Sequence, residues 1–198
     1  AQLCNLADEI AYNAHDIDDG VRSGLLTLDQ LEALSLPQRF LQQVRVDHPR
    51  LTGRRVLFET LRRMLSQQVY DVVESTRQAL LEHGVCDPDD ARRLPTMVRF
   101  SPEMRRLTDE VQRFLRANLY RHPQVAATTG LARTVLEDLF DRYVDDPSQM
   151  HAQELGARSV ERAVADYVAG MTDRFALQEH ARLTGRPLDW PARPRAAD

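Results

Sequence analysis

The stretch LADEIAYNAHDIDDG, residues 6–20, decides the fold class of this chain. Its apolar residues recur at steps of three and four, which places them on one face of an α-helix. They are Leu6, Ile10, Ala14 and Ile17. The other face is polar, since Asp8, Tyr12 and Asp16 follow one another at steps of four. The stretch therefore predicts an amphipathic helix with a core side and a polar side.

The same period continues through most of the chain, so the sequence predicts further helices. They are expected over residues 29–34, 37–46, 53–83, 101–120, 132–144 and 159–183. The clearest start is Ser101-Pro102-Glu103, which combines a hydroxyl cap, a proline at the first position and an acid near the positive end of the helix dipole. The sequence contains no alternating strand pattern of useful length and no composition break. We therefore expect an all-α fold in one helical unit.

Composition excludes several kinds of site. All 26 basic residues are arginine, which excludes a P-loop lysine, a Schiff-base lysine and the lysine of a protein-kinase site. Cys4 and Cys86 are too few for a disulfide framework. No stretch approaches 18 apolar residues, and a net charge of -4 gives no general attraction to nucleic acid. We expect a soluble, cytoplasmic protein with neither a membrane nor a nucleic-acid partner, and a buried Cys4.

The polar row of the first stretch has two interpretations. Asp8 and Asp16 lie about 12 Å apart along a helix axis, with Tyr12 midway. Such a row can hold a metal ion at one end and hydrogen-bond a polar ligand at the other. It can equally be a solvated helix face, because like charges one turn apart repel by only a few tenths of a kcal/mol. The spacing alone leaves both interpretations open.

Three motifs in order resemble one known family. The run of residues 6–20 resembles the last motif of the bacterial dGTPase-like (deoxyguanosine triphosphate triphosphohydrolase-like) branch of the HD-domain phosphohydrolases. The run DYVAGMTDRFAL, residues 166–177, resembles the C-terminal signature of that branch, and LYRHP, residues 119–123, also fits it. The first and last matches are specific, and together the three span most of the chain. The resemblance implies the C-terminal helical part of an HD-domain phosphohydrolase.

The resemblance also implies roles for the polar row. In that family a divalent metal ion (Mg, Mn, Fe or similar) lies between a His, a His-Asp pair and a later Asp, which Asp8 matches. Tyr12 and Asp16 match positions that contact the nucleotide, chiefly its sugar, in the related human SAM-and-HD-domain enzyme. The implied reaction converts a deoxynucleoside triphosphate to a deoxynucleoside and tripolyphosphate. The implied assembly is a homo-oligomer.

The chain departs from the family pattern in one respect. The other metal ligands should precede Asp8, and of the six histidines only His15 is followed by Asp, inside the later motif. We therefore expect residues 1–20 to be the last metal-binding helix of the catalytic core, 21–186 a helical region continuous with it, and 187–198 a loose tail. This chain should be inactive alone, lacking catalytic residues of its own and holding no metal by itself. It should also expose an apolar patch and self-associate.

Two other functions remain as alternatives. The chain could be a helical regulatory or interaction module without catalysis, or part of an HD phosphohydrolase that acts on another nucleotide. Among the remaining residues, Arg62 and Arg63 are weak phosphate-binding candidates, because arginine presents a planar, permanently charged fork. Tyr120 ends an apolar stripe, so we expect it in the core.

Overall fold

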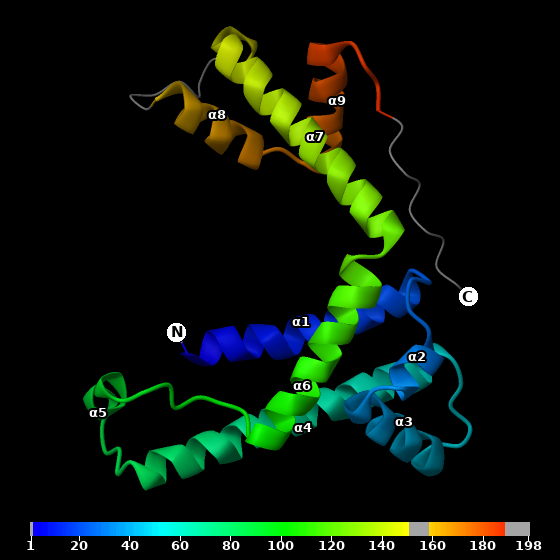
Figure 1. Cartoon of the computed structure of the whole chain (residues 1–198), viewed down its shortest axis with the longest axis vertical. Coiled ribbons are helices and arrows are strands. Elements are labelled where there is room, and N and C mark those ends of the chain that lie inside the picture. Colours follow the sequence, from blue (N-terminus) through cyan, green and yellow to red (C-terminus); the bar gives the residue numbers. More distant parts are fainter. Residues whose placement is uncertain (1, 151–158, 189–198) are drawn as a thin grey trace. The chain divides into compact units, whose positions relative to one another are not determined.

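The computed structural model describes residues 2–150 and 159–188. The secondary structure of these residues is helical without any strand, which confirms the all-α class (Figure 1). The described chain forms two compact units, which meet in sequence between His122 and Pro123. The sequence analysis predicts one continuous helical region over residues 21–186, because the amino-acid composition does not change between the two units. Proline has no backbone N–H, so Pro123 is suited to the first position of a new helix.

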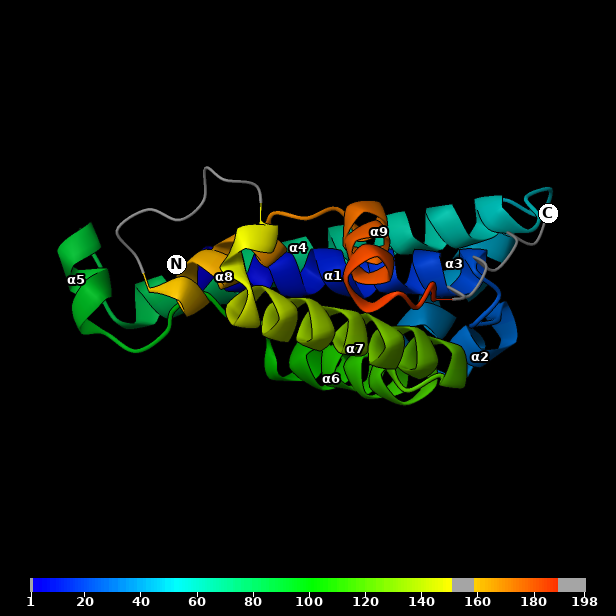
Figure 2. The same cartoon turned by 90° about the horizontal axis from the view of Figure 1, so that it is seen from above.

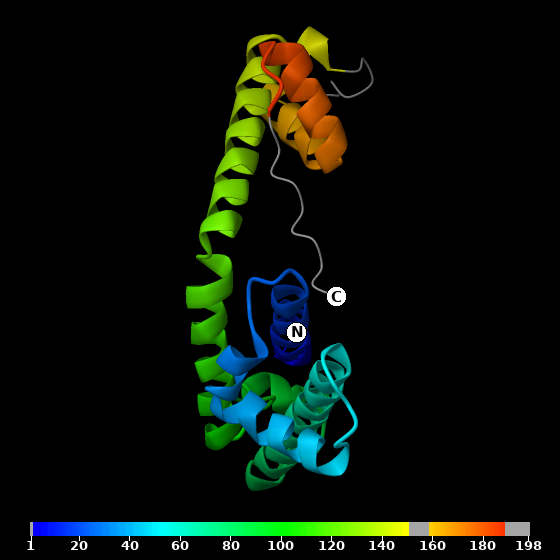
Figure 3. The ribbon, with the colours of Figure 1, turned by 90° about the vertical axis from the view of Figure 1, so that its right-hand side faces the viewer.

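The first unit contains most of the helices. They are α1 (Gln2–Arg22), α2 (Leu28–Glu32), α3 (Ser35–Asp47), α4 (Arg54–Glu82), α5 (Pro88–Arg93) and α6 (Pro102–Leu115), followed by the π-helical turn η1 (Arg116–Tyr120). The expected helices are present, and the segment from 85 to 100 contains the short α5. Helices α4 and α6 both contact α1, and α3 lies along α4 (Figures 1 and 3).

Local signals account for the starts of these helices. The hydroxyl of Ser101 accepts a hydrogen bond from the backbone N–H of Met104, so the predicted cap of α6 is confirmed. Thr27 and Gln30 form a reciprocal capping box at the start of α2. Gly20 allows the chain to fold back after α1, since a Cβ atom there would lie 2.5 Å from Cδ1 of Leu26.

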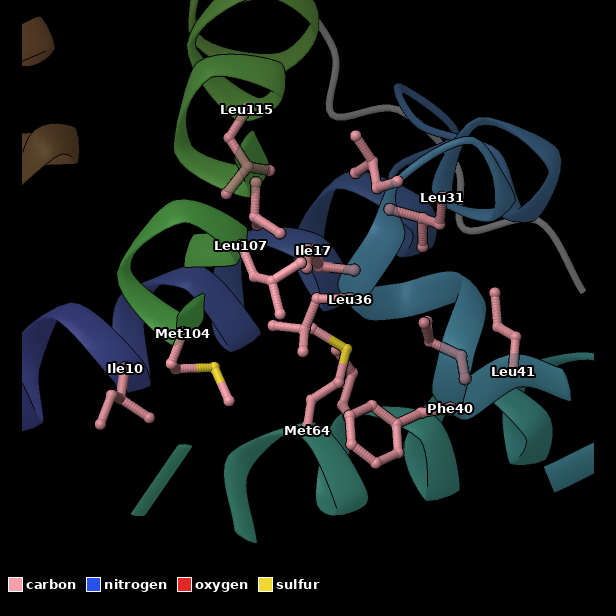
Figure 4. Packing of buried hydrophobic residues seen from close by; sticks show 14 of the residues in the cluster. Ile10, Ile17, Leu31, Leu36, Phe40, Leu41, Met64, Met104, Leu107 and Leu115 are labelled. Carbon is pink, nitrogen blue, oxygen red and sulfur yellow. The ribbon is translucent and has the colours of Figure 1, made fainter. Parts of the chain in front are cut away.

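The core of the first unit joins α1, α3, α4 and α6. Ile10 and Ile17 of α1 point into it, together with Phe40 of α3, Met64 of α4 and Leu107 of α6 (Figure 4). Ile17 is fully buried, and the four apolar residues expected on the core side of α1 are all at most 8% exposed. Burial of this stripe fixes the rotation of α1, so its polar row faces away from the core.

The second unit is a three-helix arrangement. Its helices are α7 (Pro123–Asp145), α8 (Val160–Ala169) and α9 (Asp173–Thr184), with a 3-10 turn, η2 (Pro147–Gln149), after α7. Both α8 and α9 pack against α7, which Figure 2 shows from above. Its core centres on Leu139 and Val164, which are fully buried.

Two boundaries in the second unit differ from the sequence prediction. Helix α7 begins at Pro123 rather than near Ala132, because the proline serves as its first residue although the next turns are weakly apolar. The single helix expected over 159–183 is two helices. The hydroxyl of Thr172 accepts a hydrogen bond from the N–H of Phe175, 3.3 Å away, so a new helix begins after Gly170. Residues 189–198, most of the expected tail, lie outside the described residues.

A group of partly and fully buried polar side chains joins α7 to α9; we call it the second-unit polar cluster. It consists of Asp138, Tyr143, Glu179, His180 and Arg182. The Tyr143 hydroxyl donates to Oε2 of Glu179 at 2.6 Å, and Arg182 donates to both oxygens of that carboxylate at 2.7 and 2.9 Å. The imidazole of His180 is 2% exposed, and its Nε2 lies 2.8 Å from Oδ2 of Asp138. Burial and the Glu179 carboxylate raise the pKa of Tyr143.

Across residues 2–150 and 159–188, no helix is long and apolar enough to cross a membrane.

Candidate functional site

The polar face of α1 carries the three predicted site residues. Asp8 is exposed, Tyr12 is 66% exposed and Asp16 is half-buried. Their one-turn spacing keeps them in a row, and their separation from the apolar stripe confirms the two-sided helix read from the sequence. His15, next to Asp16 in the sequence, is exposed as well.

Asp16 forms a hydrogen bond with Tyr120, a residue that the sequence analysis predicts in the core. The hydroxyl of Tyr120, from η1, donates a hydrogen bond to Oδ2 of Asp16. Burial and the neighbouring Asp16 carboxylate raise the pKa of Tyr120 to about 12. The expectation of a core Tyr120 is wrong, because Leu119 occupies the buried place at the end of the stripe and leaves Tyr120 52% exposed.

A pocket of about 880 Å³ lies between α1 and the α6–η1 segment. Tyr12 and Tyr120 both line it, which connects the predicted polar row with the residues of η1. Its other lining residues are Glu9, Asn13, Asp109, Gln112, Arg113, Leu115, Arg116 and Arg121. Its volume lies within the range of about 300–1,000 Å³ that is usual for small-molecule and cofactor sites.

Glu9 joins one wall of the pocket to the other. The guanidinium of Arg105 donates to both Glu9 oxygens, at 2.6 and 3.1 Å, and Gln112 donates to the same carboxylate at 3.0 Å. Because Glu9 is on α1 and its two donors are on α6, this network fixes the two helices that form the pocket. Helical periodicity in the sequence does not predict this network, because Glu9 lies about a hundred residues from Arg105 and Gln112.

The Asp8 carboxylate is suited to be one ligand of a hard divalent cation, and nothing in the described chain competes for it. It forms neither an ion pair nor a hydrogen bond with the described residues. No group of three or more His, Cys, Asp or Glu side chains in residues 2–150 and 159–188 could hold a metal ion. The described residues therefore hold no complete metal site, and Asp8 is a single exposed carboxylate without a partner among them.

Arg62 and Arg63 are engaged within the protein. Both donate to Glu59, with distances of 2.7 to 2.9 Å, and Arg63 also reaches Oδ2 of Asp47 at 2.6 Å. The two guanidinium groups hold the pKa of Glu59 at about 2. Their charges are therefore largely compensated, which makes them weaker phosphate ligands than unpaired arginines.

The sequence analysis predicts a buried Cys4 and an exposed apolar patch. Cys4 is exposed rather than buried, because it lies off the apolar stripe of α1. Exposed apolar side chains are present on α4, where Val69 is 48%, Tyr70 69% and Val73 59% exposed. Self-association through such a face stays a prediction.

Comparisons with known proteins agree with the motifs. Residues 98–182 match the family described as phosphohydrolase-associated domain. Three relatives carry the name deoxyguanosinetriphosphate triphosphohydrolase-like protein. The relative from Thiobacillus denitrificans is 45% identical over 185 residues, 92% of this chain and 49% of the relative. Those from Nitrosomonas europaea and Ralstonia nicotianae are both 43% identical, over 92% of this chain and 50% and 48% of their own lengths.

The chain thus spans about half the length of the curated relatives it matches. The phosphohydrolase-associated domain is consistent with the C-terminal part of such a protein. Over 92% of its length the chain is thus 43–45% identical to proteins named deoxyguanosinetriphosphate triphosphohydrolase-like, and residues 98–182 match the phosphohydrolase-associated domain; both findings agree with the resemblance that the motifs carry.

Proposed function

We propose that this chain is part of a metal-dependent triphosphohydrolase that converts a deoxynucleoside triphosphate to a deoxynucleoside and tripolyphosphate. The observation that carries the proposal is the row of Asp8, Tyr12 and Asp16 on one face of α1, beside a pocket large enough for a small ligand. The names of the relatives support the reaction class.

Asp8 is proposed as one ligand of a divalent metal ion, with a His and a His-Asp pair supplied by residues outside this chain. The bound metal would polarise the phosphate and lower the pKa of its water toward about 7. A single carboxylate does not hold such an ion firmly, so the described chain should not hydrolyse nucleotides alone. The whole protein is proposed to be a cytoplasmic homo-oligomer.

Tyr12 and Asp16 are proposed to bind the deoxyribose. Asp16 accepts the Tyr120 hydroxyl through Oδ2, which leaves Oδ1 as an acceptor for a sugar hydroxyl. Tyr120 therefore acts as a positioning residue: it holds one carboxylate oxygen so that the other faces a constant direction. The Tyr120 hydroxyl is protonated, and able to donate, at physiological pH, and its pKa of about 12 extends this state to more alkaline pH.

The test is Asp8→Asn in the full-length protein, with Asp19→Asn as the matched control. Asp19 is on the same helix but pairs with Arg22 on the exposed surface. Asp8→Asn should lower dGTP hydrolysis at least a hundredfold and reduce bound metal, whereas Asp19→Asn should retain both. Unchanged hydrolysis and metal content in Asp8→Asn would remove Asp8 from the site.

Product analysis separates the alternatives. Release of tripolyphosphate from dGTP supports the proposed reaction, and release of orthophosphate or hydrolysis of a monophosphate or cyclic nucleotide supports another HD phosphohydrolase. A full-length protein that binds no metal and hydrolyses none of these nucleotides would be the non-catalytic helical module.

A further inference from the structure

Helix α4 carries apolar side chains on two of its faces. One is the buried core face, which contains Leu57 and Met64 and packs against α1 and α3 (Figure 3). A second apolar row lies beside it and consists of Phe58, Leu65, Val69, Val73 and Leu80. Phe58, Val69 and Leu80 are spaced eleven residues apart, so they return to the same side of the helix after three turns. The second row therefore runs straight along α4 for about 33 Å.

The second row is open to solvent. Phe58 is 47%, Val69 48% and Val73 59% exposed, and Leu65 and Leu80 are half-buried. Among the large apolar side chains that are exposed in residues 2–150 and 159–188, five lie on α4, and no other helix carries more than two. Contiguous exposed apolar surface marks an interaction site, whereas apolar residues scattered singly do not. The concentration on α4 therefore indicates a surface that a partner covers.

The second row has the same pattern in both directions from Val69. Its other apolar members lie four and eleven residues away on each side, and the two polar residues on its line, Arg62 and Thr76, lie seven residues away. Two antiparallel copies that cross at Val69 therefore place apolar residues against apolar residues, and Arg62 of each copy against Thr76 of the other. A parallel pair would place Arg62 against Arg62, where like charges repel.

The charges along α4 also favour an antiparallel pair. Before Val69 the helix contains four arginines and one acidic residue, Glu59, whereas after Val69 it contains three acidic residues and one arginine, Arg77. Antiparallel packing sets the positive half of each copy beside the negative half of the other. A parallel pair would set like halves together, and such complementarity fixes orientation and register at an interface.

We propose that the second row of α4 is the contact surface between two copies of this chain, which pack antiparallel about a twofold axis at Val69. A second copy carries the complementary pattern by symmetry, because the same patch forms both sides of a twofold interface. The proposal goes beyond the proposed function, in which the homo-oligomer has no assigned surface. It uses no residue of the α1 polar row or of the pocket beside it.

Disulfide cross-linking tests the position of the axis. The experiment uses the chain with Cys4→Ser and Cys86→Ser, since both cysteines are exposed and free. In this background Val69→Cys should form a disulfide-linked dimer under mild oxidation, because Val69 faces its own copy at the axis. The control is Glu74→Cys, which is also exposed on α4 but lies about 15 Å along the helix from its own copy, beyond the reach of a disulfide.

A cross-link in Val69→Cys but not in Glu74→Cys supports the proposal. Equal cross-linking of the two variants would indicate random collisions, and a Val69→Cys chain that forms no cross-link would place the axis elsewhere. Either of these results overturns the proposal.

A mixing experiment tests the orientation of the two copies. Leu65→Cys and Val73→Cys should each cross-link poorly alone, since in an antiparallel pair each residue lies about 12 Å along the helix from its own copy. Mixed together, with a size tag on one of them, the two variants should form the mixed dimer. Linkage of each variant to itself in preference to the mixed dimer would show a parallel pair and overturn the proposal.

Light scattering over a dilution series measures the assembly of the unsubstituted chain, which should be a dimer. Val69→Asp should raise the dissociation constant of the dimer at least about a hundredfold, because it buries two like charges at the axis. The control is Leu3→Asp, which places the same charge on a residue of α1 that is 62% exposed and lies outside the row. Circular dichroism should show the same helix content in all three proteins. A monomeric unsubstituted chain, or equal losses in the two variants, would overturn the proposal.

The full-length protein separates a second copy from another part of the same protein as the occupant. A disulfide between copies of full-length Val69→Cys supports the proposal. A thiol that is protected from a maleimide reagent there, without any disulfide, would mean that another part of the same protein covers the row, and would overturn it.

Asp8→Asn distinguishes this proposal from the proposed function, since it should abolish dGTP hydrolysis by the full-length protein and leave the Val69→Cys cross-link unchanged. Loss of hydrolysis in Asp8→Asn with no cross-link overturns the α4 interface alone. Retained hydrolysis with the cross-link present overturns the Asp8 assignment alone.

Discussion

The α1 face of the first unit and the second-unit polar cluster contain the same kinds of side chain in different electrostatic states. In the second unit, Glu179 is enclosed by Tyr143 and Arg182, and Asp138 faces His180. On the α1 side, Asp8 and three pocket arginines have no partner among the described residues. A carboxylate whose oxygens accept hydrogen bonds from other residues of the protein stabilises the folded state. A carboxylate without such partners is available to bind a ligand.

The difference teaches that residue type alone does not identify a site. A Tyr–carboxylate hydrogen bond occurs in both regions, between Tyr143 and Glu179 and between Tyr120 and Asp16. Tyr143 is fully buried and Tyr120 is 52% exposed. The first bond should therefore contribute mainly to stability, and the second mainly to the orientation of Asp16.

The largest expected effect is that of Glu179→Gln. This change removes the charge that Tyr143 and Arg182 share and places an amide N–H group against donors. We expect the free energy of unfolding of the second unit to fall by about 2–3 kcal/mol. Urea denaturation measures this free energy. The half-buried counterpart, Asp16→Asn, is expected to change stability by at most about 0.5 kcal/mol. Equal losses of stability in the two variants would contradict the stated difference between the second-unit polar cluster and the α1 face.

Tyr143→Phe should have the next largest effect. It deletes one buried hydroxyl, while Glu179 keeps its two hydrogen bonds from Arg182. We expect a loss of about 1–1.5 kcal/mol in the free energy of unfolding. Thermal denaturation of Tyr143→Phe alongside Tyr167→Phe provides the control, because the Tyr167 hydroxyl has no partner among the described residues. A loss no greater than that of Tyr167→Phe would mean that the Glu179 bond adds nothing.

Glu59→Gln tests an ion pair of intermediate burial. The side chains of Glu59 and Arg63 are both 18% exposed, and that of Arg62 is 64% exposed. We expect a loss of about 1 kcal/mol at neutral pH. Because Arg62 and Arg63 lower the Glu59 pKa from 4.5 to about 2, this contribution is present above pH 4.5 and is lost as the pH falls toward 2. The stabilities of the two proteins should converge over that interval, and a constant difference would contradict the ion pair.

Tyr120→Phe should have the smallest effect on stability, at most about 0.5 kcal/mol at pH 7. The folded-state pKa of Tyr120 is raised from 10.0 to about 12, so its contribution is present below pH 10 and is lost as the pH rises through 12. Denaturation at pH 9 to 12 should show the wild-type stability approaching that of the variant. In the full-length protein, Tyr120→Phe should raise the KM for dGTP more than it lowers kcat. A change in stability with unchanged KM and kcat would contradict the proposed positioning role of Tyr120.

Much of the fold could be predicted because its signals are local. The apolar stripe of α1 and the Ser101 cap of α6 each lie within a few turns of chain, and both are confirmed. The break between α8 and α9 was missed for a local reason as well. The apolar spacing of Tyr167, Met171 and Phe175 continues across Gly170, and it conceals the competing cap at Thr172.

The candidate site could be predicted only on its α1 side. Asp8, Tyr12 and Asp16 share one helix, so their common face follows from a period of 3.6 residues. The Tyr120 contact was missed because a residue at the end of an apolar stripe is indistinguishable, by spacing, from its buried neighbour Leu119. Arg113, Arg116 and Arg121 carry no signal among 26 arginines, since only their common place in the lining of one pocket distinguishes them.

The sequence by itself determined the all-α class, the orientation of α1 toward its core and the row of polar residues on its other face, because helical periodicity and caps act over a few residues. Only the tertiary structure decided which polar groups are paired. The bonds of Tyr120 to Asp16 and of Arg105 to Glu9 join residues 104 and 96 positions apart, and packing of α6 on α1 brings them together. The pocket and its unpaired arginines are consequences of that packing.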